Sequence, residues 1–182
     1  MMSAMATETK AKKDSASKGT TPAEVARSYF EAVARQDLDA MESHYDPSGE
    51  GPIHGLVHLK QGDNYRPWFD NLFRAFPDWN FEVLNLIANE EMAAVEWRAT
   101  ATFNGTAKFE GMEPNGSKLD VQGCDVVTVR DGKITHLDAY SSGTEIARQL
   151  GALPPQGSAA ERGMTAALNL KTRATELIRS RR

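Results

Sequence analysis

The clearest signal for the fold of this chain lies in residues 119–140, LDVQGCDVVTVRDGKITHLDAY. Apolar and polar residues alternate along both halves of this stretch, which is typical of strands with one buried face. Asp131-Gly132 separates the halves, and both residues tolerate the positive φ angles of a tight hairpin turn. The stretch therefore predicts two long antiparallel strands, 119–130 and 133–140.

The residues before this hairpin predict helices and then further strands. Thr21-Pro22-Ala23-Glu24 has the capping hydroxyl, early proline and acidic third position of a helix start. Phe76-Pro77-Asp78 ends a later helix, because a residue before proline avoids the helical region. The predicted elements are two short helices broken near Gln36-Asp37, one short strand around residues 53–57, a helix over about 61–75, and strands over 81–87 and 95–103.

The residues after the hairpin complete the plan. Ser142 opens a short helix that ends at Leu150-Gly151, Pro154-Pro155 begins a linker, and Ser158 caps a last helix. Helices first and antiparallel strands afterwards indicate an α+β fold, in which N-terminal helices cover one face of a curved antiparallel sheet. The last helix is an addition to that plan.

Length and charge divide the chain into three parts. Its 182 residues suit one domain, and its net charge of −4 hides an uneven distribution. Residues 21–157 hold eleven basic and twenty-one acidic side chains, whereas both ends are basic. We expect a disordered tail over 1–20, a domain over 21–153, and a linker with a helix over 154–182. An acidic body argues against binding to nucleic acid or anionic membranes.

Cysteine use and hydropathy predict where the protein works. Cys124 is the single cysteine, so no internal disulfide can form and a reducing compartment is expected. The first twenty residues lack the apolar run of a secretory signal, and no segment is apolar for the length of a membrane span. We therefore expect a cytoplasmic protein without membrane association.

Several short strings, in this order, resemble the SnoaL-like polyketide cyclases, a branch of the fold shared with nuclear transport factor two and ketosteroid isomerase. They are Phe76-Pro77-Asp78, Gly111-Met-Glu-Pro114-Asn-Gly116, Gly123-Cys-Asp125, Asp131-Gly132-Lys133-Ile134 and Arg148-Gln149-Leu150-Gly151, and the resemblance covers about residues 21–153. It implies a cone-shaped fold with a pocket between sheet and helices. It also implies a homodimer built on the polar outer face of the strands, which carries Glu96, Arg98, Thr100, Thr102 and Thr128.

The resemblance further implies ring closure by aldol condensation without a metal or cofactor. In that family a Gln-x-His pair and an aspartate on the next strand serve the reaction, and here Gln122-x-Cys124 and Asp138 occupy those positions. Cysteine in place of histidine is a departure that separates this chain from the family pattern.

The hairpin offers a second route to the same residues, through its register. A two-residue turn at Asp131-Gly132 places Asp125 opposite Asp138, and two facing carboxyls raise one pKa toward neutrality. A bulge or an extra turn residue instead moves Asp138 beside Cys124 and near Gln122. Both alternatives keep Asp138 as an acid/base candidate, and both compete with purely structural roles for the two aspartates.

The candidate residues therefore fall into two groups. The acid/base and hydrogen-bonding candidates are Asp138, Asp125, His136 and Gln122, and the candidate ligand contacts are Tyr140, Trp68, Trp97, Tyr45 and Cys124. His44, His54 and His58 lack neighbours at metal-ligand spacing, so no metal site is expected. Aromatic residues that line an incompletely filled cone suit a hydrophobic small molecule.

Three functions are compatible with this pattern. The first is a cofactor-free enzyme that uses Asp138 to remove a proton beside a carbonyl, with Gln122 and Tyr140 or His136 holding the developing oxyanion. The second is isomerase or dehydratase chemistry with Asp125 and Asp138 as a close pair. The third is a non-catalytic, ligand-binding or dimerising module, which would have Asp138 facing solvent and aromatic side chains filling the cavity.

Overall fold

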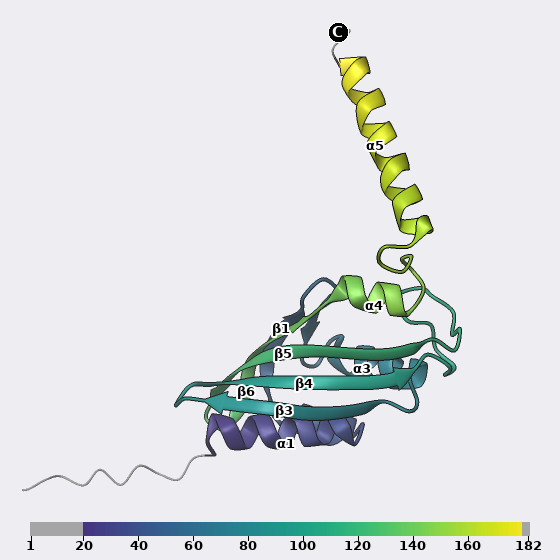
Figure 1. Cartoon of the computed structure of the whole chain (residues 1–182). Helices are drawn as coiled ribbons and strands as arrows, with labels where there is room; N and C mark the ends of the chain where they lie inside the picture. The colour runs from purple at the N-terminus through teal and green to yellow at the C-terminus, as the bar shows by residue number, and fades with distance from the viewer. Residues whose placement is uncertain (1–19, 180–182) are drawn as a thin grey trace, which may run out of the picture.

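The computed structural model describes residues 20–179 and shows an α+β fold (Figure 1). The predicted tail, apart from Thr20, lies outside the described residues. The elements in chain order are α1 (Pro22–Ala34), α2 (Leu38–Ser43), β1 (Tyr45–Ile53), β2 (Val57–Lys60), α3 (Tyr65–Ala75), β3 (Asn80–Ala88), β4 (Met92–Thr102), β5 (Lys118–Arg130), β6 (Lys133–Ser141), α4 (Gly143–Gln149) and α5 (Ala159–Arg179).

The six strands form one curved sheet in the order β2-β1-β6-β5-β4-β3. Neighbouring strands from β6 to β3 are antiparallel, as predicted, but β1 runs parallel to β6. The sheet is therefore mixed rather than wholly antiparallel. The prediction of one short strand around residues 53–57 was also wrong, because β1 and β2 form a hairpin there that adds two strands to the edge.

The first helix covers the inner face of the sheet. Its start is the predicted capping box, in which the Thr21 hydroxyl accepts from the Glu24 backbone N–H and the Glu24 carboxylate accepts from the Thr21 backbone N–H. Val25, Tyr29 and Val33 recur at helical spacing and are all buried against the strands. This helix, together with α3, supplies the second wall of the core.

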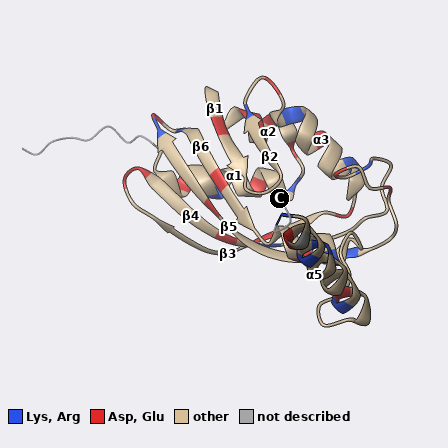
Figure 2. Ribbon diagram, turned by 90° about the horizontal axis from the view of Figure 1, so that it is seen from above, with Lys and Arg blue, Asp and Glu red and all other residues tan. Residues whose placement is uncertain are grey.

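The C-terminal part attaches at one end of the sheet. The Gln149 side chain of α4 accepts from the backbone N–H of Asp120 and donates to its carbonyl, which fixes α4 against β5. Beyond α4, α5 stands away from the sheet, and its first turn is held by an Arg148–Glu161 ion pair of 2.6 Å (Figure 1). Figure 2 shows Lys and Arg residues along α5, in agreement with the basic end predicted from the sequence.

Candidate functional site

A narrow cavity lies between the inner face of the sheet and helices α1 and α3. Its volume is about 110 Å³, which suits a slim molecule one ring wide. The wall is almost wholly apolar and aromatic; its polar or partly polar members are Tyr29, Tyr45, Tyr65, Trp68, Trp79, Trp97, Asp125 and Ser141. Such a lining accepts a hydrophobic ligand and offers few polar groups to orient it.

Asp125 is the one buried charged side chain among residues 20–179, with 6% of its surface exposed. It lies on β5, faces the cavity, and accepts a hydrogen bond of 2.8 Å from the Trp97 indole Nε1–H. Burial disfavours the ionised form and raises the pKa of this carboxyl to about 7, although the Trp97 hydrogen bond acts in the opposite direction. A carboxyl with that pKa can both accept and donate a proton near neutral pH.

A glycine on β5 lets the Trp97 ring reach this carboxyl. Gly123 lies directly opposite Trp97 in the β4–β5 register, two residues before Asp125 on the same face. A Cβ atom at Gly123 would meet the Trp97 ring at 2.3 Å and the Tyr140 carbonyl oxygen at 2.5 Å, which are impossible contacts. The missing side chain therefore provides the space in which the indole lies over β5.

Three tyrosines line the same cavity as Asp125. The hydroxyls of Tyr29 on α1 and Tyr65 on α3 share a hydrogen bond of 3.0 Å, and the Tyr45 ring packs against both of theirs. Burial raises the pKa of all three phenols, and the charge of Asp125 raises those of Tyr29 and Tyr45 further. These hydroxyls consequently stay protonated. In the Tyr29–Tyr65 hydrogen bond one hydroxyl donates and the other accepts, and the accepting hydroxyl can donate its own proton to a ligand.

The structure places four of the predicted site residues around the cavity. Asp125, Trp97, Trp68 and Tyr45 all line it. Tyr29, Tyr65, Trp79 and Ser141 join them, and the sequence reading had not assigned these four to the site. Tyr29 and Tyr65 recur with the apolar residues on the inner faces of their helices, so their spacing identified them as buried but not as polar contributors.

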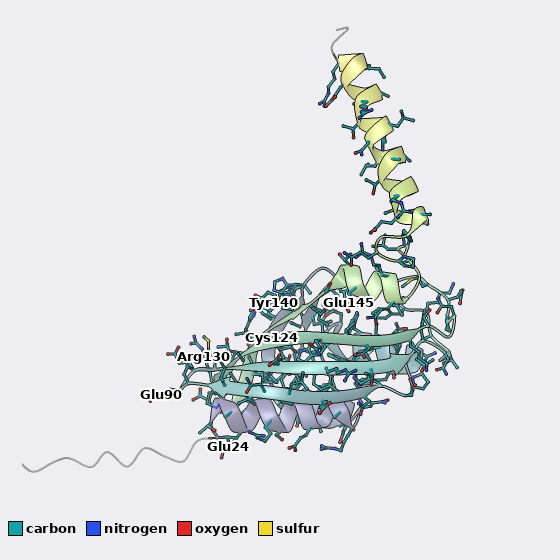
Figure 3. All side chains as sticks on the ribbon, in the orientation of Figure 1. Glu24, Glu90, Cys124, Arg130, Tyr140 and Glu145 are labelled. Atoms are coloured by element: carbon teal, nitrogen blue, oxygen red, sulfur yellow. The ribbon has the colours of Figure 1, made fainter. Side chains whose placement is uncertain are left out.

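The other five predicted residues lie on the outer face of the sheet. Asp138 contacts two imidazoles there, His54 Nε2 at 3.0 Å and His136 Nε2 at 3.2 Å, and the His54 ring stacks on Tyr140 at 4.3 Å. Gln122, Cys124 and Tyr140 line a separate open hollow on this face, and Figure 3 labels Cys124 and Tyr140 on their neighbouring strands. Burial raises the pKa of the Cys124 thiol, so the thiol form is favoured.

The regular hairpin register was wrong, whereas the alternative with a bulge was right about the bulge and about the face that Asp138 shares with Gln122 and Cys124. The strands do turn at Asp131-Gly132, but β6 carries a bulge between the pairs Val129–Ile134 and Thr128–His136. Asp138 consequently lies opposite Val126, and Ala139 lies opposite Asp125. Because side chains alternate between faces, this one-residue shift turns Asp138 away from the cavity. The two aspartates are therefore not a close pair.

Within residues 20–179, no three His, Cys, Asp or Glu side chains gather as a metal site would require. None of the described helices is both long and apolar enough to cross a membrane.

Comparison with known proteins places the chain among relatives of similar architecture. Residues 26–137 match the family model described as the SnoaL-like domain. No curated protein matches the chain. Two solved structures illustrate the shared fold. A candidate SnoaL-like polyketide cyclase from Jannaschia sp. CCS1 is 20% identical over 79% of this chain and 100% of its own, with a TM-score of 0.66. AclR from Streptomyces galilaeus, a candidate hydroxylase, is 22% identical over 82% of this chain and 94% of its own, with a TM-score of 0.64.

Proposed function

This chain belongs to the SnoaL-like family, and from that membership and the geometry of its cavity we propose that it is an enzyme in which Asp125 transfers a proton to or from a hydrophobic, carbonyl-containing small molecule. The observation that carries the proposal is the burial of Asp125 in an apolar cavity, with a pKa raised to about 7. A buried carboxyl is costly to the fold, so its presence at the cavity wall favours a chemical role.

The proposed step is removal of a proton from the carbon next to the carbonyl. Near pH 7 the ionised Asp125 carboxyl can take that proton, and the same group in its protonated form can return it to another atom. Removal leaves negative charge on the carbonyl oxygen, which needs a hydrogen-bond donor nearby. The Tyr29–Tyr65 hydroxyl pair is the candidate donor, because it lies on the same cavity and retains its protons.

This proposal moves the acid/base role from Asp138 to Asp125. Asp138 is hydrogen-bonded to His54 on the outer face, and the sheet itself separates it from the cavity. An aldol ring closure of the polyketide cyclase kind and an isomerisation both begin with the same proton removal. The cavity chemistry therefore supports the shared first step, and the fate of the enolate depends on the substrate.

A second candidate is a ligand-binding module without catalysis. The observation that favours it is the position of Asp138 on the outer face, together with the dense aromatic lining of the cavity. In that case Asp125 would act only as a hydrogen-bonding partner for a bound ligand.

Deuterium exchange separates the two candidates without knowledge of the natural substrate. Acetophenone is one ring wide, and its methyl protons exchange in D₂O only through the enol or enolate, so their loss can be followed by proton NMR. We expect the wild-type protein to accelerate this exchange and Asp125→Asn to reduce the acceleration by about a hundredfold, since general bases contribute at least that factor. Binding without acceleration by the wild type would favour the non-catalytic module.

The Asp138→Asn variant provides the matched comparison. It removes a carboxylate of the same type from the neighbouring strand, on the opposite face of the sheet. We expect its exchange rate to equal that of the wild type. A rate lost in Asp138→Asn and kept in Asp125→Asn would restore the assignment predicted from the sequence and refute this one.

We also propose that the protein forms a homodimer through the outer face of its sheet. The outer face of the sheet exposes apolar side chains, among them Ile87 at 68% and Tyr140 at 47% of their surface. Exposed apolar side chains on a sheet face are a common feature of subunit contacts. Sedimentation equilibrium of the wild type and of Ile87→Glu would test this, with dissociation expected in the variant.

A further inference from the structure

The cavity wall carries a polar side chain, Trp79, that the proposed proton transfer does not use. The Trp79 side chain lines the cavity, and its indole Nε1–H is buried without a hydrogen-bond partner among the described residues. Buried N–H groups are almost always paired, by protein, water or ligand. Because Trp79 lines the cavity, a ligand oxygen bound there is a candidate partner for this donor.

Trp79 is held firmly in place. It follows the turn that ends α3, where its backbone N–H donates to the Phe76 carbonyl at 3.1 Å and the two rings meet edge-on at 6.2 Å. The Gln36 side chain donates to the Trp79 carbonyl at 3.4 Å. These contacts hold the Trp79 backbone on both sides and pack its ring against Phe76.

The strand register places Trp79 near one end of the cavity, well separated from Asp125 along the strands. Trp79 directly precedes Asn80, which pairs with Thr100 on β4, and Thr100 pairs with Asp120 on β5. Asp125 lies five residues further along β5, a distance of about 17 Å at the backbone. Leu119 and Val121 line the cavity at the Trp79 end, so the cavity follows this strand.

We infer that Trp79 is a specificity-determining residue, whose Nε1–H binds a second oxygen of the substrate at the opposite end from the carbonyl that meets Asp125. The substrate class is therefore an elongated, slim and largely apolar molecule with an oxygen acceptor at each end. A molecule with one terminal carbonyl could present its proton to Asp125 but would leave the Trp79 donor unpaired. This inference rests on the proposed function for the role of the first carbonyl.

A pair of shape-matched ligands tests the inference. Para-diacetylbenzene has a carbonyl at each end, whereas para-isopropylacetophenone replaces one carbonyl oxygen by a methyl group of similar size. The chain has three tryptophans, so a ¹⁵N-labelled protein gives three indole N–H signals. We expect para-diacetylbenzene to shift the Trp79 signal downfield and para-isopropylacetophenone to leave it near its free position.

Affinity gives the second measurement. Trp79→Phe keeps an aromatic ring and removes the donor. It should therefore weaken the binding of para-diacetylbenzene roughly three- to tenfold and leave the affinity for para-isopropylacetophenone unchanged. The Trp79 signal can be assigned from this variant or, if the variant does not fold, from nuclear Overhauser contacts with Phe76. Trp68→Phe, which alters another cavity indole, is the control and should affect both ligands equally.

The results separate this inference from the proposed function. An unchanged Trp79 signal, equal weakening of both ligands by Trp79→Phe, or no binding of para-diacetylbenzene up to its solubility would each overturn the inference. Deuterium exchange that depends on Asp125 would still support the proposed function in those cases. Conversely, a shifted Trp79 signal without any accelerated deuterium exchange would support the role of Trp79 in binding and refute the proposed catalysis.

Discussion

Replacement of Asp125 by asparagine should change how the stability of the protein depends on pH. In the folded state burial keeps the proton on this carboxyl up to about pH 7, whereas an unfolded chain releases it near pH 4. Unfolding in that interval therefore releases a proton, and the free energy of unfolding falls as the pH rises. The stabilising contribution is complete below pH 4 and is lost as the pH passes the folded pKa of about 7.

The expected magnitude follows from the two pKa values. A difference of about three units corresponds to about 4 kcal/mol, and the 6% exposure of Asp125 leaves little solvent to screen it. Asparagine has the same shape, does not titrate, and can still accept from the Trp97 indole. The difference in unfolding free energy between Asp125→Asn and the wild type should therefore grow by about 4 kcal/mol in favour of the variant between pH 4 and pH 8.

Urea unfolding at a series of pH values measures this difference, and carboxyl ¹³C NMR of Asp125 gives the pKa directly. Asp120→Asn is the control, since Asp120 lies on the same strand with 53% of its side chain exposed. The Arg98 hydrogen bond lowers the pKa of Asp120, so its contribution is constant above pH 5 and is lost only in more acidic solution. A constant difference for Asp125→Asn from pH 4 to pH 8 would refute the burial argument.

Three further predictions concern the surroundings of the cavity. Trp97→Phe removes the donor to Asp125, so the pKa of that carboxyl should rise above about 7, which a ¹³C titration would detect; a fall would contradict the contact. Gly123→Ala should lower the unfolding free energy by about 1–3 kcal/mol through overpacking, while Gly143→Ala, whose Cβ would meet nothing within 4 Å, should change it little in the same urea assay. Truncation after Gly157 should leave the melting temperature nearly unchanged, because α5 is largely exposed; a large drop would show that α5 supports the domain.

The fold was largely predictable because its signals are local. The capping box at Thr21, the proline that ends α3 and the turn at Asp131-Gly132 each act within a few residues, and each is present in the structure. The parallel pairing of β1 with β6 was not predictable in this way, since it joins segments about ninety residues apart. Residues 45–52 include Gly and Pro and lack strand alternation, so their place in the sheet depends on tertiary contacts.

The candidate site was only partly predictable, and the reason is one bulge. The sequence contained a signal for the bulge. Ile134 and Leu137 are both apolar and lie three residues apart, and two residues at that spacing in a strand point to the same face only if a bulge adds one residue between them. The regular register placed Asp125 and Asp138 on one face, whereas the bulged alternative moved Asp138 toward Cys124 and Gln122. The bulge placed them on opposite faces and left Asp125 alone in the cavity.

Local patterns in the sequence were enough to predict the order of helices and strands apart from the β1–β2 hairpin, the acidic body with its basic ends, and the resemblance to the SnoaL-like family. These depend on side-chain periodicity, charge and short motifs, which need no knowledge of distant contacts. The tertiary structure alone decided which residues share the cavity: Asp125 with Trp97 and the tyrosines, Trp79 near one end, and Asp138 outside. The physical reason is that side chains alternate between faces along a strand, so a shift of one residue reverses the side to which each points.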